Sequence, residues 1–186
     1  MRSGDLYSFL LLLSLTLYSV HLYQVQSLRL SSFPAEPFSP FSIALKTLQS
    51  DINYTFENVQ LLGRAMTHAS YSEENNRALS ILGSGVIESS MVLQLVDKNL
   101  DISGKDLNHR ISEFSKEASC AADGMRLRLE KVIRVSSKTN SSAPGVVCGA
   151  YRAFFGAVTL DSESLDTAGG VFLGIWEDRV GKAMAM

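Results

Sequence analysis

Several kinds of residue are scarce in this 186-residue chain. It has two cysteines, Cys120 and Cys148, which are too few for a disulfide framework and lack the paired spacing of a zinc finger. It has no basic excess, because 17 Lys and Arg stand against 19 Asp and Glu. Proteins that hold nucleic acid by charge alone usually show such an excess or a basic stripe. The composition therefore argues against that class of protein.

The chain does contain enough apolar residues to bury the core of one domain, since 46% of its residues are hydrophobic. Three of the four prolines fall in residues 28–41, which predicts an extended linker. Over residues 42–178 apolar side chains recur at helical spacing, and no stretch alternates like a β-strand. We predict a single all-α domain followed by a C-terminal tail, 179–186. Helices are expected near 43–48, 59–70, 76–96, 107–114, 146–160 and 164–176, with one or two more within 116–134.

Residues 1–27 have the pattern of a secretory signal peptide. The 15 residues from Leu6 to Val20 carry no charge. This run is shorter than the roughly 20 apolar residues of a membrane-spanning helix, and it suits a signal-peptide core followed by cleavage after Ser27. An uncleaved signal anchor and a mitochondrial or plastid presequence are the alternatives. Asp5 and the single arginine in this segment argue against a presequence.

Two N-glycosylation sequons follow, at Asn53 (Asn-Tyr-Thr) and at Asn140 (Asn-Ser-Ser). Such tripeptides are common by chance, but both agree with a secretory address. In an oxidising lumen Cys120 and Cys148 could pair and close a loop worth roughly 3 kcal/mol. Two buried free thiols are the alternative, and the sequence leaves both open.

Three stretches, in this order, resemble the catalytic domain of the ribonuclease III family. Tyr54-x-Phe56 precedes a leucine-rich segment, 61–70, that ends in Thr-His-Ala-Ser. Residues 76–86 (NRALSILGSGV) are similar to the family signature Asn-Glu-Arg-Leu-Glu-Phe-Leu-Gly-Asp-Ala-Val. Residues 153–161 (AFFGAVTLD) are similar to its closing motif. The resemblance spans residues 45–175 and implies the helical fold of that catalytic domain.

The resemblance also implies where a catalytic site would lie, and there the sequence departs from the family. Ribonuclease III enzymes cleave double-stranded RNA with Mg²⁺ held by four carboxylates on two facing helices. Those carboxylates fall on Ser80, Ser84, Gly149 and Arg152 of this chain. Four negative charges are thus replaced by one positive charge, whereas Mg²⁺ requires anionic oxygen ligands. We expect a pseudoenzyme with no metal and no cofactor at this site.

Nearby side chains have structural interpretations. Arg152 is expected to pair with a carboxylate such as Glu88, with a bound anion as the alternative. Glu88, on the same helical face as Ser84, would bind Mg²⁺ poorly by itself. His68 is expected to hydrogen-bond at a helix end, because no nucleophile or orienting acid accompanies it. Close helix–helix contact is the expected reason for the helical glycines, Gly83, Gly85, Gly149 and Gly156.

Two functions follow from the resemblance. The first is a non-catalytic homodimer or heterodimer, formed through the helix that bears the signature. The apolar residues of that helix are Ile81, Leu82, Val86 and Ile87. Similarity to short plant members of the family implies a role in karyogamy, the fusion of nuclei in the female gametophyte. The second is RNA processing, as a double-stranded-RNA endonuclease or RNA binder with weak or partner-dependent activity. No DNA partner is expected.

Overall fold

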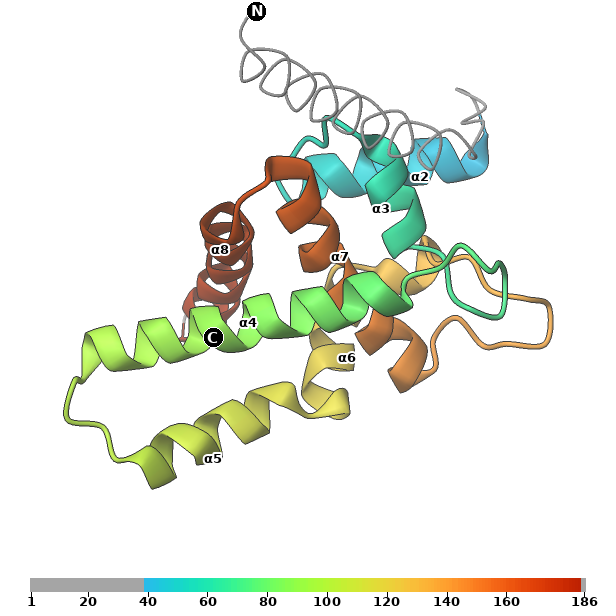
Figure 1. The fold of residues 1–186 in the computed structure, drawn as a ribbon. Helices are drawn as coiled ribbons and strands as arrows, with labels where there is room; N and C mark the ends of the chain where they lie inside the picture. Colours follow the sequence, from blue (N-terminus) through green and yellow to red (C-terminus); the bar gives the residue numbers. More distant parts are fainter. Residues whose placement is uncertain (1–38, 185–186) are drawn as a thin grey trace, which may run out of the picture. The chain divides into compact units, whose positions relative to one another are not determined.

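The computed structural model describes residues 39–184, and in that range the chain forms helices and no strand (Figure 1). The predicted signal peptide and most of the predicted linker lie outside the described residues. The predicted all-α fold is confirmed. The helices are α2 (Pro40–Asp51), α3 (Val59–Ala65), α4 (Arg77–Lys98), α5 (Gly104–Ser115), α6 (Glu117–Arg126), the 3₁₀ helix η1 (Leu129–Lys131), α7 (Pro144–Ser162) and α8 (Leu165–Met184).

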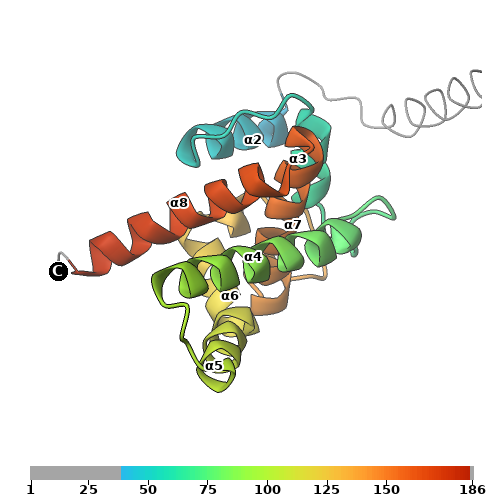
Figure 2. The ribbon, with the colours of Figure 1, turned by 60° about the vertical axis from the view of Figure 1, so that its left-hand side comes forward.

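Helix α7 lies at the centre of the fold and contacts α3, α4, α6 and α8 (Figures 1 and 2). Its side chains are apolar on nearly every face, which is typical of a helix surrounded by other helices. Phe154 and Phe155 are fully buried, and the ring of Phe155 stands edge-to-face on Phe172 of α8, 5.5 Å between centroids. Burial of these aromatic rings supplies much of the hydrophobic stabilisation of the core.

Helices α4 and α7 meet through their backbones at two glycines. A Cβ built on Gly83 of α4 would overlap the carbonyl oxygen of Arg152 and lie 2.7 Å from the nitrogen of Gly156. A Cβ built on Gly156 would overlap the carbonyl oxygen of Leu79. Only glycine fits at either position, as expected. The prediction of close helix–helix contact is wrong for Gly85 and Gly149, because a Cβ on either would meet nothing within 4 Å.

The carboxylate of Asp161, near the end of α7, accepts hydrogen bonds from the loop between α2 and α3. It accepts hydrogen bonds from the Tyr54 hydroxyl at 2.9 Å and from the backbone nitrogens of Glu57 at 3.0 Å and Asn58 at 2.8 Å. Burial, together with this bond to Asp161, raises the pKa of Tyr54 to about 12. Hydrogen bonds to the Asp161 side chain therefore connect the first family motif to the last one.

Helix α3 ends at Ala65 and not near Ser70 as predicted. Beyond it the backbone bonds to a distant segment, because the Arg134 nitrogen donates to the Met66 carbonyl at 2.8 Å and the His68 nitrogen donates to the Arg134 carbonyl at 3.0 Å. These bonds form an isolated bridge between Thr67 and Arg134. Tertiary hydrogen bonds thus replace the last predicted turn of this helix.

Two other boundaries differ from the predicted ones. Helix α2 begins at Pro40, inside the predicted linker, because Ser39 caps it by accepting from the Ser42 nitrogen at 3.1 Å. Helix α8 continues to Met184, so most of the predicted tail, 179–186, is helical. Among the described residues, α4 alone is long and apolar enough to cross a membrane by length and composition, with a mean hydropathy of 1.5.

The glycine contact gives a test with a matched control. We expect Gly156→Ala to lower the free energy of unfolding by about 2–3 kcal/mol, because the added methyl group forces α4 and α7 apart. Gly149→Ala, in the same helix but facing open space, should raise it by up to about 1 kcal/mol through helix propensity. Urea denaturation followed by circular dichroism measures both. Equal stabilities of the two variants would contradict a backbone contact between the helices.

Candidate functional site

A small pocket lies where α4, α7 and the corner between α5 and α6 meet. Its volume is about 10 Å³, which is room for a single water molecule. Two of the four predicted site residues, Ser84 and Arg152, line it together with Glu88. The other lining residues are Ile87, Phe114, Ser115, Cys120, Asp123, Tyr151 and Phe172.

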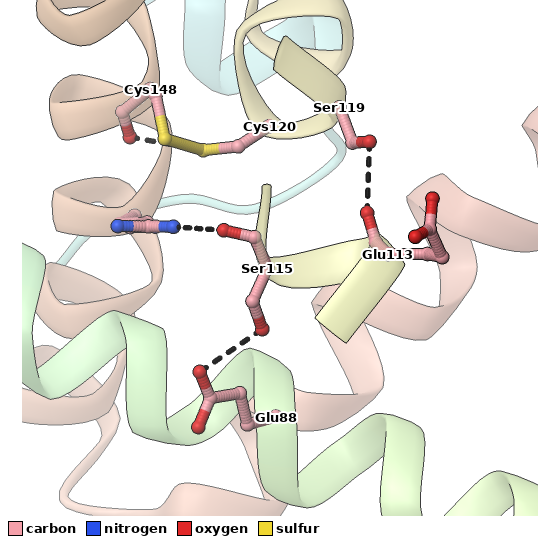
Figure 3. The surroundings of a disulfide bond; sticks show 7 residues. Glu88, Glu113, Ser115, Ser119, Cys120 and Cys148 are labelled. Atoms are coloured by element: carbon pink, nitrogen blue, oxygen red, sulfur yellow. Dashed lines mark hydrogen bonds between the residues drawn. A yellow bond between two sulfur atoms is a disulfide. The ribbon is translucent and has the colours of Figure 1, made fainter. Parts of the chain in front are cut away.

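Arg152 and Glu88 are linked through Ser115 and not directly. Arg152 Nη2 donates to the Ser115 carbonyl oxygen at 2.7 Å, and the Ser115 hydroxyl donates to Glu88 Oε1 at 3.1 Å (Figure 3). Among the described residues no ion pair joins Arg152 to Glu88, so that prediction is wrong. Ser115 is the last residue of α5, whose terminal carbonyl groups lack helical partners and attract a cation. The guanidinium therefore acts as a cap for α5.

Ser80 and Gly149 lie one turn before Ser84 and Arg152 on their respective helices. Both are half-buried, and neither lines the pocket. The space beside Gly149 is open, so a side chain could be accommodated there. The structure thus places the four predicted residues on two helices that touch, but it brings only Ser84 and Arg152 to a common pocket.

The donor set at these positions does not fit Mg²⁺. Two hydroxyl groups, a glycine without a side chain and a guanidinium offer no anionic oxygen, which is the ligand that this ion requires. The two carboxylates that line the pocket are already engaged, Asp123 with Arg126 at 2.7 Å and Glu88 with Ser115. Among the described residues no group of three or more His, Cys, Asp or Glu side chains could hold a metal ion.

A disulfide joins α6 to α7 beside the pocket (Figure 3). The Cα atoms of Cys120 and Cys148 lie 5.0 Å apart, and Cys148 directly precedes Gly149. The two helices are also close at Gly124, where an added Cβ would lie 2.6 Å from the Val147 side chain. Covalent and packing contacts therefore hold α6 against the helix that carries Arg152.

The described histidines lie outside the pocket. His68 Nδ1 accepts a hydrogen bond from the Ser70 nitrogen at 3.1 Å, in the turn that follows α3. His109 is exposed on α5. Within the described part of the chain, the lining of the pocket therefore includes no imidazole that could act as a general base.

Sequence reasoning missed two residues that shape the pocket, Ser115 and Asp123. Ser115 acts mainly through a backbone carbonyl, which every residue has, so its identity carried no signal. Asp123 is 8% exposed, and its i,i+3 spacing to Arg126 is the one pattern that could have drawn attention to it.

Comparison with known proteins matches this fold and these motifs to one family. The family model described as "Ribonuclease-III-like" matches residues 58–173. The chain belongs to the ribonuclease III-like family. It is 50% identical to the protein NUCLEAR FUSION DEFECTIVE 2 of Arabidopsis thaliana over 153 residues, 81% of this chain and 80% of that protein.

Bacterial relatives and solved structures agree with this family. The chain is 32% identical to ribonuclease 3 of Bordetella petrii over 130 residues, 68% of this chain and 51% of that enzyme. It spans only about half the length of that bacterial enzyme. A solved nuclease domain of ribonuclease III from Campylobacter jejuni, described for flexibility in a region involved in dimer formation, superposes with a TM-score of 0.69. It is 25% identical and covers 72% of this chain and 96% of that domain.

The disulfide is expected to stabilise the ribonuclease III-like domain. Replacing both cysteines by serine should lower the free energy of unfolding by about 3–4 kcal/mol, because the bond closes a loop of 28 residues in the unfolded chain. Urea denaturation with and without a reducing agent measures this effect. The reductant should destabilise the natural chain and leave the double serine variant unchanged. If the reducing agent lowered the free energy of unfolding equally in the natural chain and in the double serine variant, the result would contradict a disulfide between these cysteines.

Proposed function

We propose that this protein is a non-catalytic ribonuclease III-like protein that acts by dimerising or by binding a partner, with a role in nuclear fusion. The observation that carries the proposal is the set of residues at the four positions where the family holds Mg²⁺, namely Ser80, Ser84, Gly149 and Arg152. The 50% identity to NUCLEAR FUSION DEFECTIVE 2 supports the assignment to karyogamy.

Electrostatics argues against catalysis. A guanidinium next to a divalent cation repels it, and Arg152 lines the same pocket as Ser84. The hydrogen bond from Arg152 to the Ser115 carbonyl keeps this positive charge in place. A two-metal mechanism needs carboxylates to hold both ions and to activate water, and the four positions supply none.

The outer face of α4 is the proposed interface. Ile81 is 78% exposed and Leu93 is 68% exposed, although both lie on a strongly apolar helix. Large apolar side chains that stay exposed on a surface helix are candidates for contact with a partner. Val86 and Ile87, which we expected on this surface, are instead buried inside the domain, at 3% and 7% exposure. A second copy of this chain or a related chain is the proposed partner.

The proposed location is the secretory pathway or the endoplasmic reticulum, which is continuous with the nuclear envelope. Three features support it: the uncharged segment from Leu6 to Val20, the sequons at Asn53 and Asn140, and a disulfide, which persists in oxidising compartments. A mitochondrial or plastid location is the alternative.

The second candidate function is RNA processing, and the 32% identity to a bacterial ribonuclease 3 favours it. It requires that this chain cleave double-stranded RNA weakly or with a partner, or that it bind RNA without cleavage. Binding of this kind would weaken steeply with added salt, because phosphate contacts release counterions.

A cleavage assay separates the two functions. Residues 28–186, incubated with labelled double-stranded RNA and either Mg²⁺ or Mn²⁺, should give no metal-dependent product. The variant carrying Ser80→Glu, Ser84→Asp, Gly149→Asp and Arg152→Glu should bind Mg²⁺ in a calorimetric titration, because two helices that touch would then carry four carboxylates. Metal-dependent cleavage by the natural sequence would overturn the proposal, and Glu88 would become the first residue to replace.

The interface is tested by one substitution on α4. Ile81→Asp should raise the dimer dissociation constant by about tenfold or more, because it places a charge in an apolar contact. Ile43→Asp is the matched control, since Ile43 is also exposed, at 58%, but lies on α2. Sedimentation velocity of residues 28–186 measures both variants. Equal association of the two variants, or a purely monomeric natural chain that also fails to pair with a related chain, would exclude this face.

A further inference from the structure

The two sequon asparagines differ from the buried asparagines Asn75 and Asn76 in what their side chains do. Asn75 and Asn76 are buried, and the amide nitrogen of each donates to backbone carbonyl groups of Ser72, Glu73 or Ala65. Asn53 and Asn140 are exposed. Within the described residues, neither of their amide nitrogens donates a hydrogen bond. The atom that accepts a glycan is thus free at both sequons.

The two sequons lie in defined turns. Asn53 follows α2 with a φ of 53°, a left-handed conformation that asparagine tolerates better than most residues. Its neighbour Tyr54 is fixed to Asp161 by the 2.9 Å hydrogen bond. Asn140 accepts from the Ser142 nitrogen at 2.9 Å through its side-chain oxygen, which leaves its nitrogen available.

The sequons lie at opposite ends of α7. Asn53 is next to the residue that bonds Asp161 near the C-terminal end of this helix, and Asn140 comes four residues before its first residue, Pro144. A helix of 19 residues is about 28 Å long. Helix α4 crosses α7 between these ends, at Gly83 and Gly156. Along α7, glycans at the two sequons would therefore lie on either side of the point where α4 crosses it.

We propose that Asn53 and Asn140 both carry N-linked glycans. The proposal rests on the secretory address given under the proposed function. An oligosaccharide would be transferred from a lipid-linked pyrophosphate donor. Asn Nδ2 forms a bond to C1 of the first sugar and loses one proton, while the C1–oxygen bond breaks and the lipid pyrophosphate leaves. The Cys120–Cys148 disulfide forms in the same oxidising compartment.

The test is translation of the full chain in the presence of endoplasmic-reticulum microsomes. The natural sequence should shift on a gel by two glycan units that endoglycosidase H removes. Asn53→Gln and Asn140→Gln should each lose one unit, and the double variant should lose both. Thr55→Ala and Ser142→Ala should repeat these losses with both asparagines retained. Asn108→Gln, at an exposed position of α5 outside any sequon, should keep both glycans.

Added protease distinguishes failure of this proposal from failure of the secretory address. A chain that is protected inside the microsomes but carries no glycan would overturn the proposal and leave the secretory address supported. A single glycan would overturn it for the unmodified sequon. A chain that protease digests and that carries no glycan would overturn the secretory address, and the glycans with it.

Discussion

The backbone contact between α4 and α7 is the constraint on which the rest of the fold depends. Gly83 and Gly156 let the two helices approach until a carbonyl oxygen of one helix occupies the place where a side chain of the other would lie. This contact sets the distance and rotation of the helices that bear the two family motifs. The aromatic core around Phe155 and the pocket that contains Ser84 and Arg152 both form around this crossing.

Beside the same crossing, contacts between distant parts of the chain surround the pocket that Ser84 and Arg152 line. In this protein Arg152 caps α5 at Ser115, Ser115 binds Glu88 of α4, and a disulfide joins α6 to α7. These contacts connect four helices around a pocket with room for one water molecule. Such an arrangement can be stable without a metal ion, because the positive charge lies against a helix C-terminus. The Arg152 side chain thus serves to connect α7 to α5 in this chain.

Helix α4 has a buried apolar face and two apolar side chains that remain exposed. Its inner face, including Val86 and Ile87, packs into the domain, whereas Ile81 and Leu93 remain largely exposed. In the proposed function a second chain covers the outer face, which explains why an apolar helix of 22 residues is tolerated at the surface of the domain.

The sequence by itself determined the fold class and the approximate place of each helix, because apolar residues at helical spacing can be buried only on packed helices. From the resemblance it also predicted which residues occupy the four family positions, and this remains a prediction. Only the tertiary structure decided which glycines touch a neighbouring helix, that Arg152 bonds a backbone carbonyl and not Glu88, and that α3 stops at Ala65. Each of these outcomes depends on a partner distant in sequence, Gly156 for Gly83, Ser115 for Arg152 and Arg134 for Met66. Local periodicity carries no information about such partners.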